Sequence, residues 1–211
     1  MKIESPKLSR DLPLKNFHDI FYDEDPELDT CTIEEANFEN EAVERVHLTN
    51  MMIKNSRFSN TDFKMINLTD VYFENCDLSN ADLSKASIHR VVFKNCKLMG
   101  VDLSDSRFGN VLFDQSVLSL AMLGTSKFEK VIFKDTLLKG ADLYDCTLKK
   151  INFQSCDMDG ANFEQTSLKG VDISTSTFQT LTVSIENLRG CKVSTQQALQ
   201  FSALMGLEII E

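Results

Sequence analysis

A five-residue period runs through almost the whole sequence and leaves very few folds open to it. Counting in fives from Ile33 to Val193 meets thirty-three residues, all of them Leu, Phe, Ile, Val or Met. The residue two positions earlier is mostly small or β-branched, and the remaining positions are mostly polar. Helices repeat every 3.6 residues and strands every two, so neither has this period. Each unit of five is therefore expected to send two side chains inward and then turn a corner.

A second period, of twenty residues, indicates how many corners close one coil. Every twentieth residue from Phe73 to Phe153 is a phenylalanine, and each is preceded two positions earlier by Val or Ile. Like residues recur every four units, so we expect four units per coil and coils stacked at the strand spacing of about 4.8 Å. The sequence predicts an all-β, right-handed quadrilateral β-helix of about eight coils without inserted loops, right-handedness being the default for such crossovers.

The two ends of this predicted solenoid read differently from its middle. We expect residues 1–30 to form an N-terminal cap and first coil segment, residues 31–193 the repeat, and residues 194–211 a C-terminal capping and dimerisation element. Ser194 and Gln197 have the spacing of a capping box, and Gly206 is a stop signal. A helix is thus predicted from about Thr195 to Met205, followed by a strand from Leu207 to Ile210.

The predicted C-terminal helix carries more apolar surface than one contact can bury. A short helix of this kind has to cover the last coil and a partner as well, which predicts a homodimer. A cap on a monomer, without a partner, is the alternative. The expected dimerisation residues are Leu199, Phe201, Leu204, Met205 and Ile209.

Charge and targeting signals narrow the class of partner and the compartment. The formal net charge is -10, which argues against direct binding of nucleic acid and favours a cationic partner or one that normally binds an anion. The N-terminus has no apolar core of a secretory signal, and no stretch has the length of a membrane span. Six cysteines without an export signal predict reduced thiols and a cytoplasmic protein.

No pattern of residues predicts catalysis. All six cysteines occupy inward positions, and there is no CxxC motif or Cys/His cluster; His18, His47 and His89 are scattered. Nucleophile elbows, phosphate loops and dinucleotide-binding fingerprints do not occur. We therefore expect no enzyme activity, no cofactor and no metal.

Function is then expected on the outer surface, where charge is distributed unevenly. The side centred on Val43, Phe63 and Leu83 has nine acidic and three basic residues, whereas the adjacent side centred on Leu48 has a net positive charge. Acidic residues that only keep the rod soluble are the alternative. The acidic residues predicted to contact a partner are Asp62, Asp82, Asp102, Asp105, Asp142, Asp145 and Glu164.

Outward positions in the middle of the repeat turn apolar. Leu120 and Met122 interrupt columns of Asn/Gly and Asp. Exposed apolar patches commonly mark partner sites, so we expect a contiguous patch here. The alternatives are ordinary strand residues, or cover from a folded-back N-terminus. The predicted patch comprises Val92, Leu112, Val117, Leu120, Met122 and Ile132.

Two features of the sequence resemble known proteins. The phrases "ADLSK", "ADLYD" and "ANFEQ" are similar to the A(D/N)LXX unit of pentapeptide-repeat proteins, over about residues 28–193. The tail from Ser167 to Ile210 resembles the C-terminal region of quinolone-resistance (Qnr-type) proteins of Gram-positive bacteria. Gram-negative members interrupt their coils with loops that help protection, and this chain has no insertion between residues 33 and 193.

The resemblance implies more than the repeat pattern does. It implies a quadrilateral β-helix, a dimer joined through C-terminal helices, and binding to DNA gyrase and topoisomerase IV as a DNA mimic that counters fluoroquinolones. A rod that serves an unrelated cytoplasmic partner through its apolar patch is the other hypothesis. A contact that depends on inserted loops does not carry over to this chain.

Overall fold

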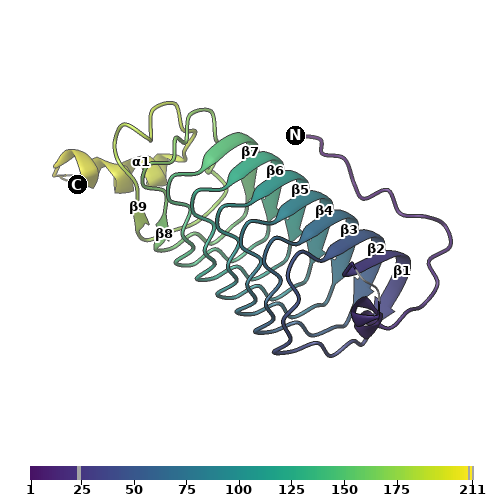
Figure 1. Cartoon of the computed structure of the whole chain (residues 1–211). Coiled ribbons are helices and arrows are strands. Elements are labelled where there is room, and N and C mark those ends of the chain that lie inside the picture. Colours follow the sequence, from purple (N-terminus) through teal and green to yellow (C-terminus); the bar gives the residue numbers. More distant parts are fainter. Residues whose placement is uncertain (23–24, 209, 211) are drawn as a thin grey trace.

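Stacked parallel strands, each of which passes around one corner, form two adjacent sides of a long solenoid (Figure 1). The computed structural model describes residues 1–22, 25–208 and 210. Seven eight-residue strands pair in chain order: β1 (Glu27–Glu34), β2 (His47–Lys54), β3 (Asn67–Glu74), β4 (Ser87–Lys94), β5 (Arg107–Asp114), β6 (Lys127–Lys134) and β7 (Thr147–Gln154). Two short strands, β8 (Ala161–Asn162) and β9 (Leu181–Thr182), pair on another side.

One register holds from coil to coil. Phe73 pairs with Phe93, and Phe93 with Phe113, each an offset of twenty residues. The same offset joins the remaining sides, where single bridges connect neighbouring coils, such as Asp62 with Asp82. The predicted four-sided β-solenoid of about eight coils is therefore confirmed, and no insertion interrupts the pairing from Glu27 to Lys192.

The corners of the coil are built by left-handed residues. Every fifth residue from Thr30 to Gly170 has φ between 49° and 79°. Sixteen of these 29 corners are Asn, Asp or Gly, the residue types that adopt this conformation at least cost. The period of five thus has a backbone cause, because one residue in each unit has to accept a left-handed conformation to turn the chain.

Aromatic and aliphatic columns fill the interior. Rings from Phe73 to Phe153 stack nearly parallel at every twentieth residue, with centroids 4.8–5.2 Å apart. Small polar residues at inward positions bond to the backbone of neighbouring coils. The Ser116 hydroxyl donates to the Phe93 carbonyl and accepts from the Cys96 N–H, both at 3.1 Å. No described buried side-chain nitrogen or oxygen lacks a partner.

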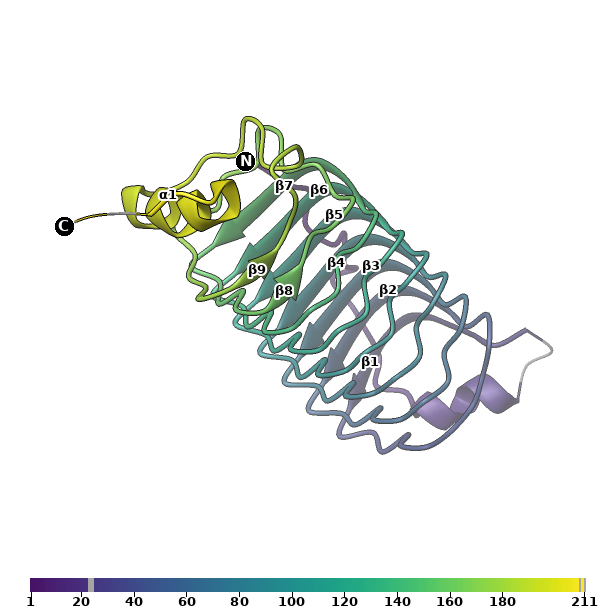
Figure 2. The same cartoon turned by 90° about the vertical axis from the view of Figure 1, so that its left-hand side faces the viewer.

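An N-terminal cap closes the first coil. The 3-10 helix η1 (Phe17–Phe21) begins with a capping box at Asn16 and buries Phe17 and Ile20. The Phe17 ring lies edge-on to Phe38 and Phe58, with centroids 4.7 and 4.8 Å away. This cap ends the open apolar core at that end of the rod (Figure 2).

Residues 1–14 take a path that the repeat pattern does not predict. They run back from the first coil along the outside of the strands, so the N-terminus lies beside the far end of the sheet (Figure 1). The Glu4 N–H donates to Asn110, the Lys7 N–H to Asp70 and the Ser9 N–H to Asn50. We call this segment the N-terminal strap.

The last coil departs from the regular corners. No residue between Gly170 and Gly190 has the left-handed conformation, and the corner positions there are Thr175, Thr180 and Ile185. The N–H groups of Asn187 and Leu188 instead donate to the Ser184 carbonyl in a helical turn. The twenty-residue offset persists nonetheless, as the pairing of Asp172 with Lys192 shows.

The C-terminal element begins as predicted but ends differently. Helix α1 (Thr195–Ser202) has the capping box of Ser194 and Gln197, and the 3-10 helix η2 (Ala203–Met205) continues it to Gly206. The strand predicted from Leu207 to Ile210 is wrong for the described residues of that segment, none of which pairs with the solenoid. Ile209 lies outside the described residues.

Candidate protein-interaction surfaces

The acidic side of the rod contains two kinds of carboxylate. Asp62, Asp82, Asp102 and Asp142 are partly covered, and each accepts the N–H of the residue two positions later at 2.9–3.1 Å. This Asx turn shapes the corner, as the corresponding bond of Asn162 does. These four residues therefore have a structural role whether or not a partner is bound.

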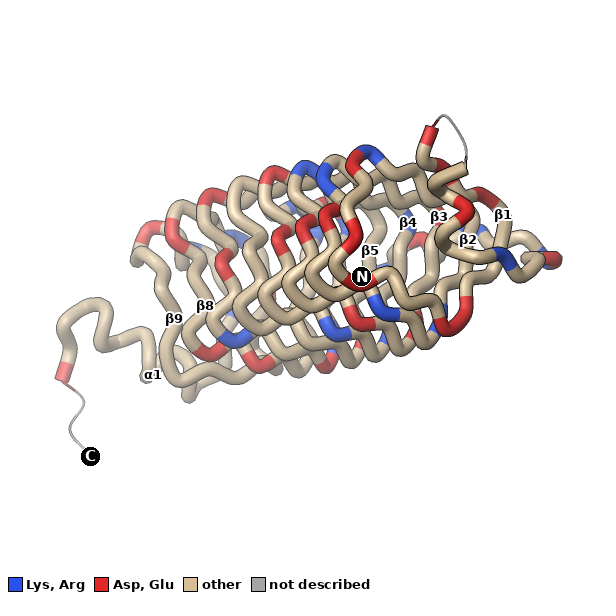
Figure 3. Tube along the Cα trace, turned by 60° about the horizontal axis from the view of Figure 1, so that its bottom comes forward, with Lys and Arg blue, Asp and Glu red and all other residues tan. Residues whose placement is uncertain are grey.

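The other three predicted acidic residues point to solvent. Asp105, Asp145 and Glu164 are exposed on the same side, with Asp145 two coils from Asp105 and Glu164 one coil beyond Asp145. No ion pair within 4.0 Å joins them to a described basic residue, whereas Lys64 lies 3.2 Å from Asp82 and 3.6 Å from Asp62. The hydrogen bond that the Lys64 ammonium donates to Asp82 raises the pKa of Lys64. Acidic residues thus recur on successive coils, with free charge toward the C-terminal half (Figure 3).

The predicted apolar patch spreads over three sides of the coil, with Val117 on the side between the other two groups. Val92, Leu112 and Ile132 stack on β4, β5 and β6, and Val92 is buried with 7% of its surface exposed. Leu120 and Met122 lie about half a coil away and are 64% and 46% exposed. Since a coil has four sides of five residues, a separation of ten residues places the two groups on opposite sides.

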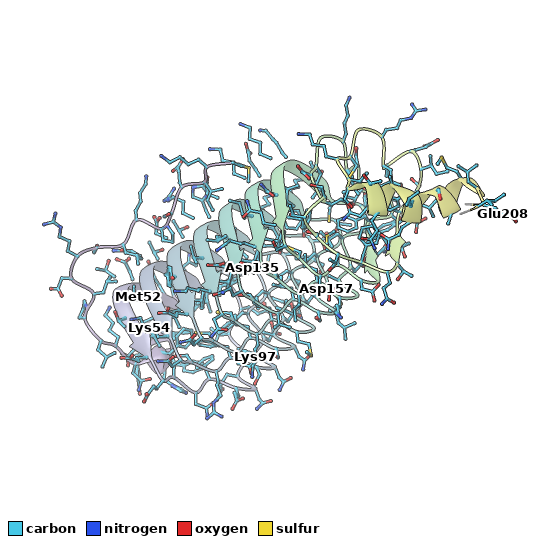
Figure 4. The ribbon with its side chains drawn as sticks, turned by 180° about the vertical axis from the view of Figure 1, so that it is seen from behind. Met52, Lys54, Lys97, Asp135, Asp157 and Glu208 are labelled. Carbon is cyan, nitrogen blue, oxygen red and sulfur yellow. The ribbon has the colours of Figure 1, made fainter. Side chains whose placement is uncertain are left out.

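The exposed group forms a corner of its own. Val117 stacks on Leu137 in a column that runs from Asn37 to Thr177 and includes Lys97 and Asp157, both labelled in Figure 4. Leu120 lies at the end of that side, between the bare corners Gly100 and Gly140. We call this surface the Leu120 corner; it comprises Met99, Val117, Leu120, Met122 and Leu137, of which all but half-buried Val117 are exposed.

The opposite corner is polar and covered by the strap. The Arg90 guanidinium pairs with Asp70 through two hydrogen bonds of 2.6 Å, and the two side chains are 17% and 12% exposed. The hydrogen bond from Arg90, helped by the Lys7 N–H, lowers the pKa of Asp70. Asn110 is likewise buried beneath the strap. We call this surface the strapped corner; it comprises Asn50, Asp70, Arg90, Asn110 and Lys130.

The C-terminal helices divide their apolar residues between the rod and solvent. Phe201 faces the last coil, with its ring centroid 5.2 Å from that of Phe178. Leu199, Leu204 and Met205 are 52%, 42% and 57% exposed. Four of the five predicted dimerisation residues are thus placed, three of them toward solvent, and the fifth, Ile209, is not among the described residues.

Three of the cysteines are poor nucleophiles. All six cysteines are free, and five of them are buried. Burial raises the pKa of Cys146, Cys156 and Cys191 to about 11, so their thiolates are scarce at neutral pH. Among the described residues no three His, Cys, Asp or Glu side chains are placed to hold a metal, and no helix is long and apolar enough to cross a membrane.

Comparison with known proteins identifies the repeat. The family model "Pentapeptide repeat region" matches residues 66–143, and "Pentapeptide repeats (8 copies)" matches residues 136–174. Together the two matches span more than half of the chain. No curated protein matches the sequence.

Solved structures share the same solenoid at low sequence identity. HetL, a pentapeptide repeat protein involved in heterocyst differentiation regulation in the cyanobacterium Nostoc, is 18% identical with a TM-score of 0.51, over 80% of this chain and 83% of HetL. Trypsin-treated QnrB1, a plasmid-mediated fluoroquinolone resistance protein, is 19% identical with a TM-score of 0.45, over 87% of this chain and 90% of QnrB1. At this level of identity the likeness to HetL establishes the fold alone.

Proposed function

This chain belongs to the pentapeptide-repeat family, and from that premise we infer that it is a protein-binding rod that occupies the DNA-binding surface of a type II topoisomerase. The targets we propose are DNA gyrase and topoisomerase IV, which the protein would protect from fluoroquinolones. The resemblance of the tail from Ser167 to Ile210 to Qnr-type proteins supports this choice of partner. Such an activity requires shape and charge but no catalytic residue.

The observation that carries the proposal is the row of free carboxylates along one straight side. Asp105, Asp145 and Glu164 are exposed on a rigid rod, where the shared register fixes their spacing. B-DNA carries one charge per about 1.7 Å, which is far denser than this row. Mimicry here therefore rests on rod shape and one acidic edge rather than on matching the charge of DNA.

The C-terminal helices support a dimer in this proposal. Leu199, Leu204 and Met205 expose apolar surface at the end of the rod, beyond the last coil (Figure 2). Two copies joined there by a two-fold axis would place two acidic edges in one longer object. A topoisomerase that holds a long DNA segment could then contact both rods. The proteins it would meet are cytoplasmic, and we propose that location for it.

A supercoiling assay with ciprofloxacin tests the proposal. Purified DNA gyrase is assayed with the drug, with and without stoichiometric and excess protein, and rescue of supercoiling is the expected result. The triple substitution Asp105→Asn, Asp145→Asn, Glu164→Gln should weaken rescue about tenfold, because three free charges of the edge are lost. Neither rescue nor inhibition by the wild-type protein, with topoisomerase IV tested in parallel, would refute the proposal.

A charge-matched control separates the edge from net charge. Glu34→Gln, Glu35→Gln and Asp135→Asn remove the same three charges from exposed positions on a different side of the coil, where Asp135 is labelled in Figure 4. This variant should protect gyrase as the wild type does. If both triple variants lost gyrase protection equally, net charge rather than the position of the acidic edge would account for the effect.

A rod for a different protein partner is the second candidate. The observation that favours it is the Leu120 corner, where apolar side chains are exposed. A DNA surface has no counterpart to these side chains, so mimicry of DNA does not account for them. A wild-type protein that forms a dimer but neither binds nor affects either topoisomerase would favour this candidate.

A further inference from the structure

We propose that the Leu120 corner is the anchor through which this rod docks, and that its partner presents an apolar hollow rimmed by Lys and Arg side chains. The inference deepens the proposed function, on which it rests, by naming the contact site on the rod and the chemistry of the opposing surface. It depends on three observations about the corner. Two residues depart from the residue types of their columns, the neighbouring corners are glycines, and carboxylates lie on one flank.

The first broken rule is at Leu120. Its φ is 60°, a left-handed conformation that costs a leucine more than it costs Asn or Gly. All the other members of its column, at residues 40, 60, 80, 100, 140 and 160, are Asn or Gly. The leucine is 64% exposed as well, so it gains little from burial in return. A leucine that is both strained and exposed in the free protein is explained if a partner buries it on binding.

The second broken rule lies two residues away. Met122 stands in the column where Asp82, Asp102 and Asp142 make the Asx turn. A methionine has no oxygen with which to accept the corresponding N–H, and 46% of its surface is in water. The two exceptions flank one buried alanine, Ala121, at the junction of two consecutive units of the repeat. Local rules are commonly broken where a site needs a residue for another purpose.

The surface around Leu120 is bare, which allows close approach. Gly100 and Gly140 are its neighbours in the column, and the Leu120 Cδ2 atom lies 2.9 Å from where a Cβ on Gly140 would be. The leucine therefore lies over the next corner, with no side chain there to cover it. Met99, Val117 and Leu137 extend the apolar surface on three successive coils.

The surroundings specify the charge of the partner. Asp102 and Asp142 lie directly below and above Met122 in its column, and Asp105 and Asp145 are exposed at the next corner. Lys139, the basic residue stacked beside Leu120, is already paired with Asp157 at 3.0 Å. The apolar centre is therefore flanked by carboxylates on the Met122 side, and this arrangement is complementary to an apolar hollow with cations along the matching flank. A surface that normally binds DNA supplies those cations.

The N-terminal strap leaves this corner free. The strap hydrogen-bonds to Asn50, Asp70 and Asn110, and Asn110 is ten residues, or half a coil, from Leu120. The strap therefore covers the diagonally opposite corner. Leu120 and Met122 remain available to a partner in the intact chain.

The test is a variant that repairs the repeat. Leu120→Asn with Met122→Asn leaves net charge unchanged and installs residues the chain already uses at equivalent positions, Asn80 and Asn162. Relief of the left-handed strain should raise the melting temperature by roughly 2–4 °C, so loss of binding is not a consequence of unfolding. Affinity for purified DNA gyrase or topoisomerase IV, measured by interferometry, should fall roughly 30-fold, as for two hot-spot residues.

A matched control is Met65→Asn. Met65 is the other large apolar residue at a left-handed corner, with φ 60° and 45% exposure, far from the Leu120 corner in the rod. It should stabilise the protein and leave binding unchanged. If the wild type binds and the double variant binds equally well, the anchor is refuted while the proposed function stands. If the wild type binds neither enzyme, the proposed function fails and this inference fails with it.

Discussion

The strapped corner and the Leu120 corner occupy opposite edges of the same coils and treat polarity in opposite ways. At the strapped corner, charged and amide side chains are largely covered, and Asp70 and Asn110 are 8% and 6% exposed. At the Leu120 corner, apolar side chains are 41–64% exposed, apart from half-buried Val117. Both corners have the same backbone, with one left-handed residue per unit.

The difference shows that the repeat fixes where a corner lies but not what covers it. Polar residues are covered where a segment of the same chain supplies hydrogen bonds to each of them, because a buried polar group without a partner is costly. Apolar residues are exposed where no described segment lies over them. One corner is covered by a segment of the same chain, and the other is exposed among the described residues.

The largest effect is expected when the covered ion pair is broken. Asp70→Ala leaves the Arg90 guanidinium without its carboxylate and removes the acceptor of the Lys7 N–H. We expect the free energy of unfolding to fall by about 3 kcal/mol, because a poorly solvated charge is left unpaired. Chemical denaturation followed by circular dichroism measures this change.

The control for this substitution has the same backbone conformation. Asp105 is also a left-handed Asp with φ 57°, but it is exposed and bonds only to the Thr125 hydroxyl. Asp105→Ala should cost at most about 1 kcal/mol. A similar loss in both variants would show that backbone strain, rather than the strap and the ion pair, sets the cost.

A smaller effect is expected from removing the strap itself. Deletion of residues 2–10 removes three N–H donors, each contributing about 1 kcal/mol, but it also releases the entropy cost of ordering the segment. We expect a net loss of about 1 kcal/mol and unchanged affinity for the topoisomerase. If the deletion weakened binding as much as the change at Leu120 and Met122 does, the two corners would not be independent.

The smallest effect is a pH dependence confined to acidic solution. The pKa of Asp70 is lowered in the folded protein, chiefly by Arg90, so its contribution to stability is complete above about pH 4 and is lost as pH falls below its unfolded value of 3.8. The free energy of unfolding is measured by urea titration at a series of pH values between 2.5 and 7. Below pH 4, its slope against pH should be shallower for Asp70→Asn than for the wild type. Identical slopes would indicate that Asp70 is not paired in solution.

Most of the fold follows from the sequence, because the periods of five and twenty are carried by residues whose burial is decisive. The Phe73 to Phe153 column, the box at Ser194 and Gln197, and the stop at Gly206 all lie where local chemistry predicts them. The strap was not predictable in the same way. It is held by single bonds from main-chain N–H groups to Asn and Asp side chains far along the chain, and such bonds leave no periodic pattern.

The arrangement of the surface was not predictable for a similar reason. Val92 and Met122 are both apolar residues at outward positions, and only the coil geometry shows that they lie on opposite sides. Asp82 and Asp105 likewise look alike in sequence, although Asp82 shapes a turn and Asp105 is exposed at a corner. The irregular last coil was foreshadowed by the loss of Asn, Asp and Gly at residues 175, 180 and 185.

Because the offset is always twenty residues, the length of the rod is a whole number of coils. Removing or duplicating any twenty consecutive residues would keep every column in line, so the length of such a protein can change in single steps without redesign of its core. The strap opposes that freedom. Its residues 4, 7 and 9 meet corners at 110, 70 and 50, so an added coil between Asn50 and Asn110 would put those contacts out of step. The three coil steps from Asn50 to Asn110 are therefore fixed by the chain's own N-terminus, whereas the coils after β6 lie beyond its contacts.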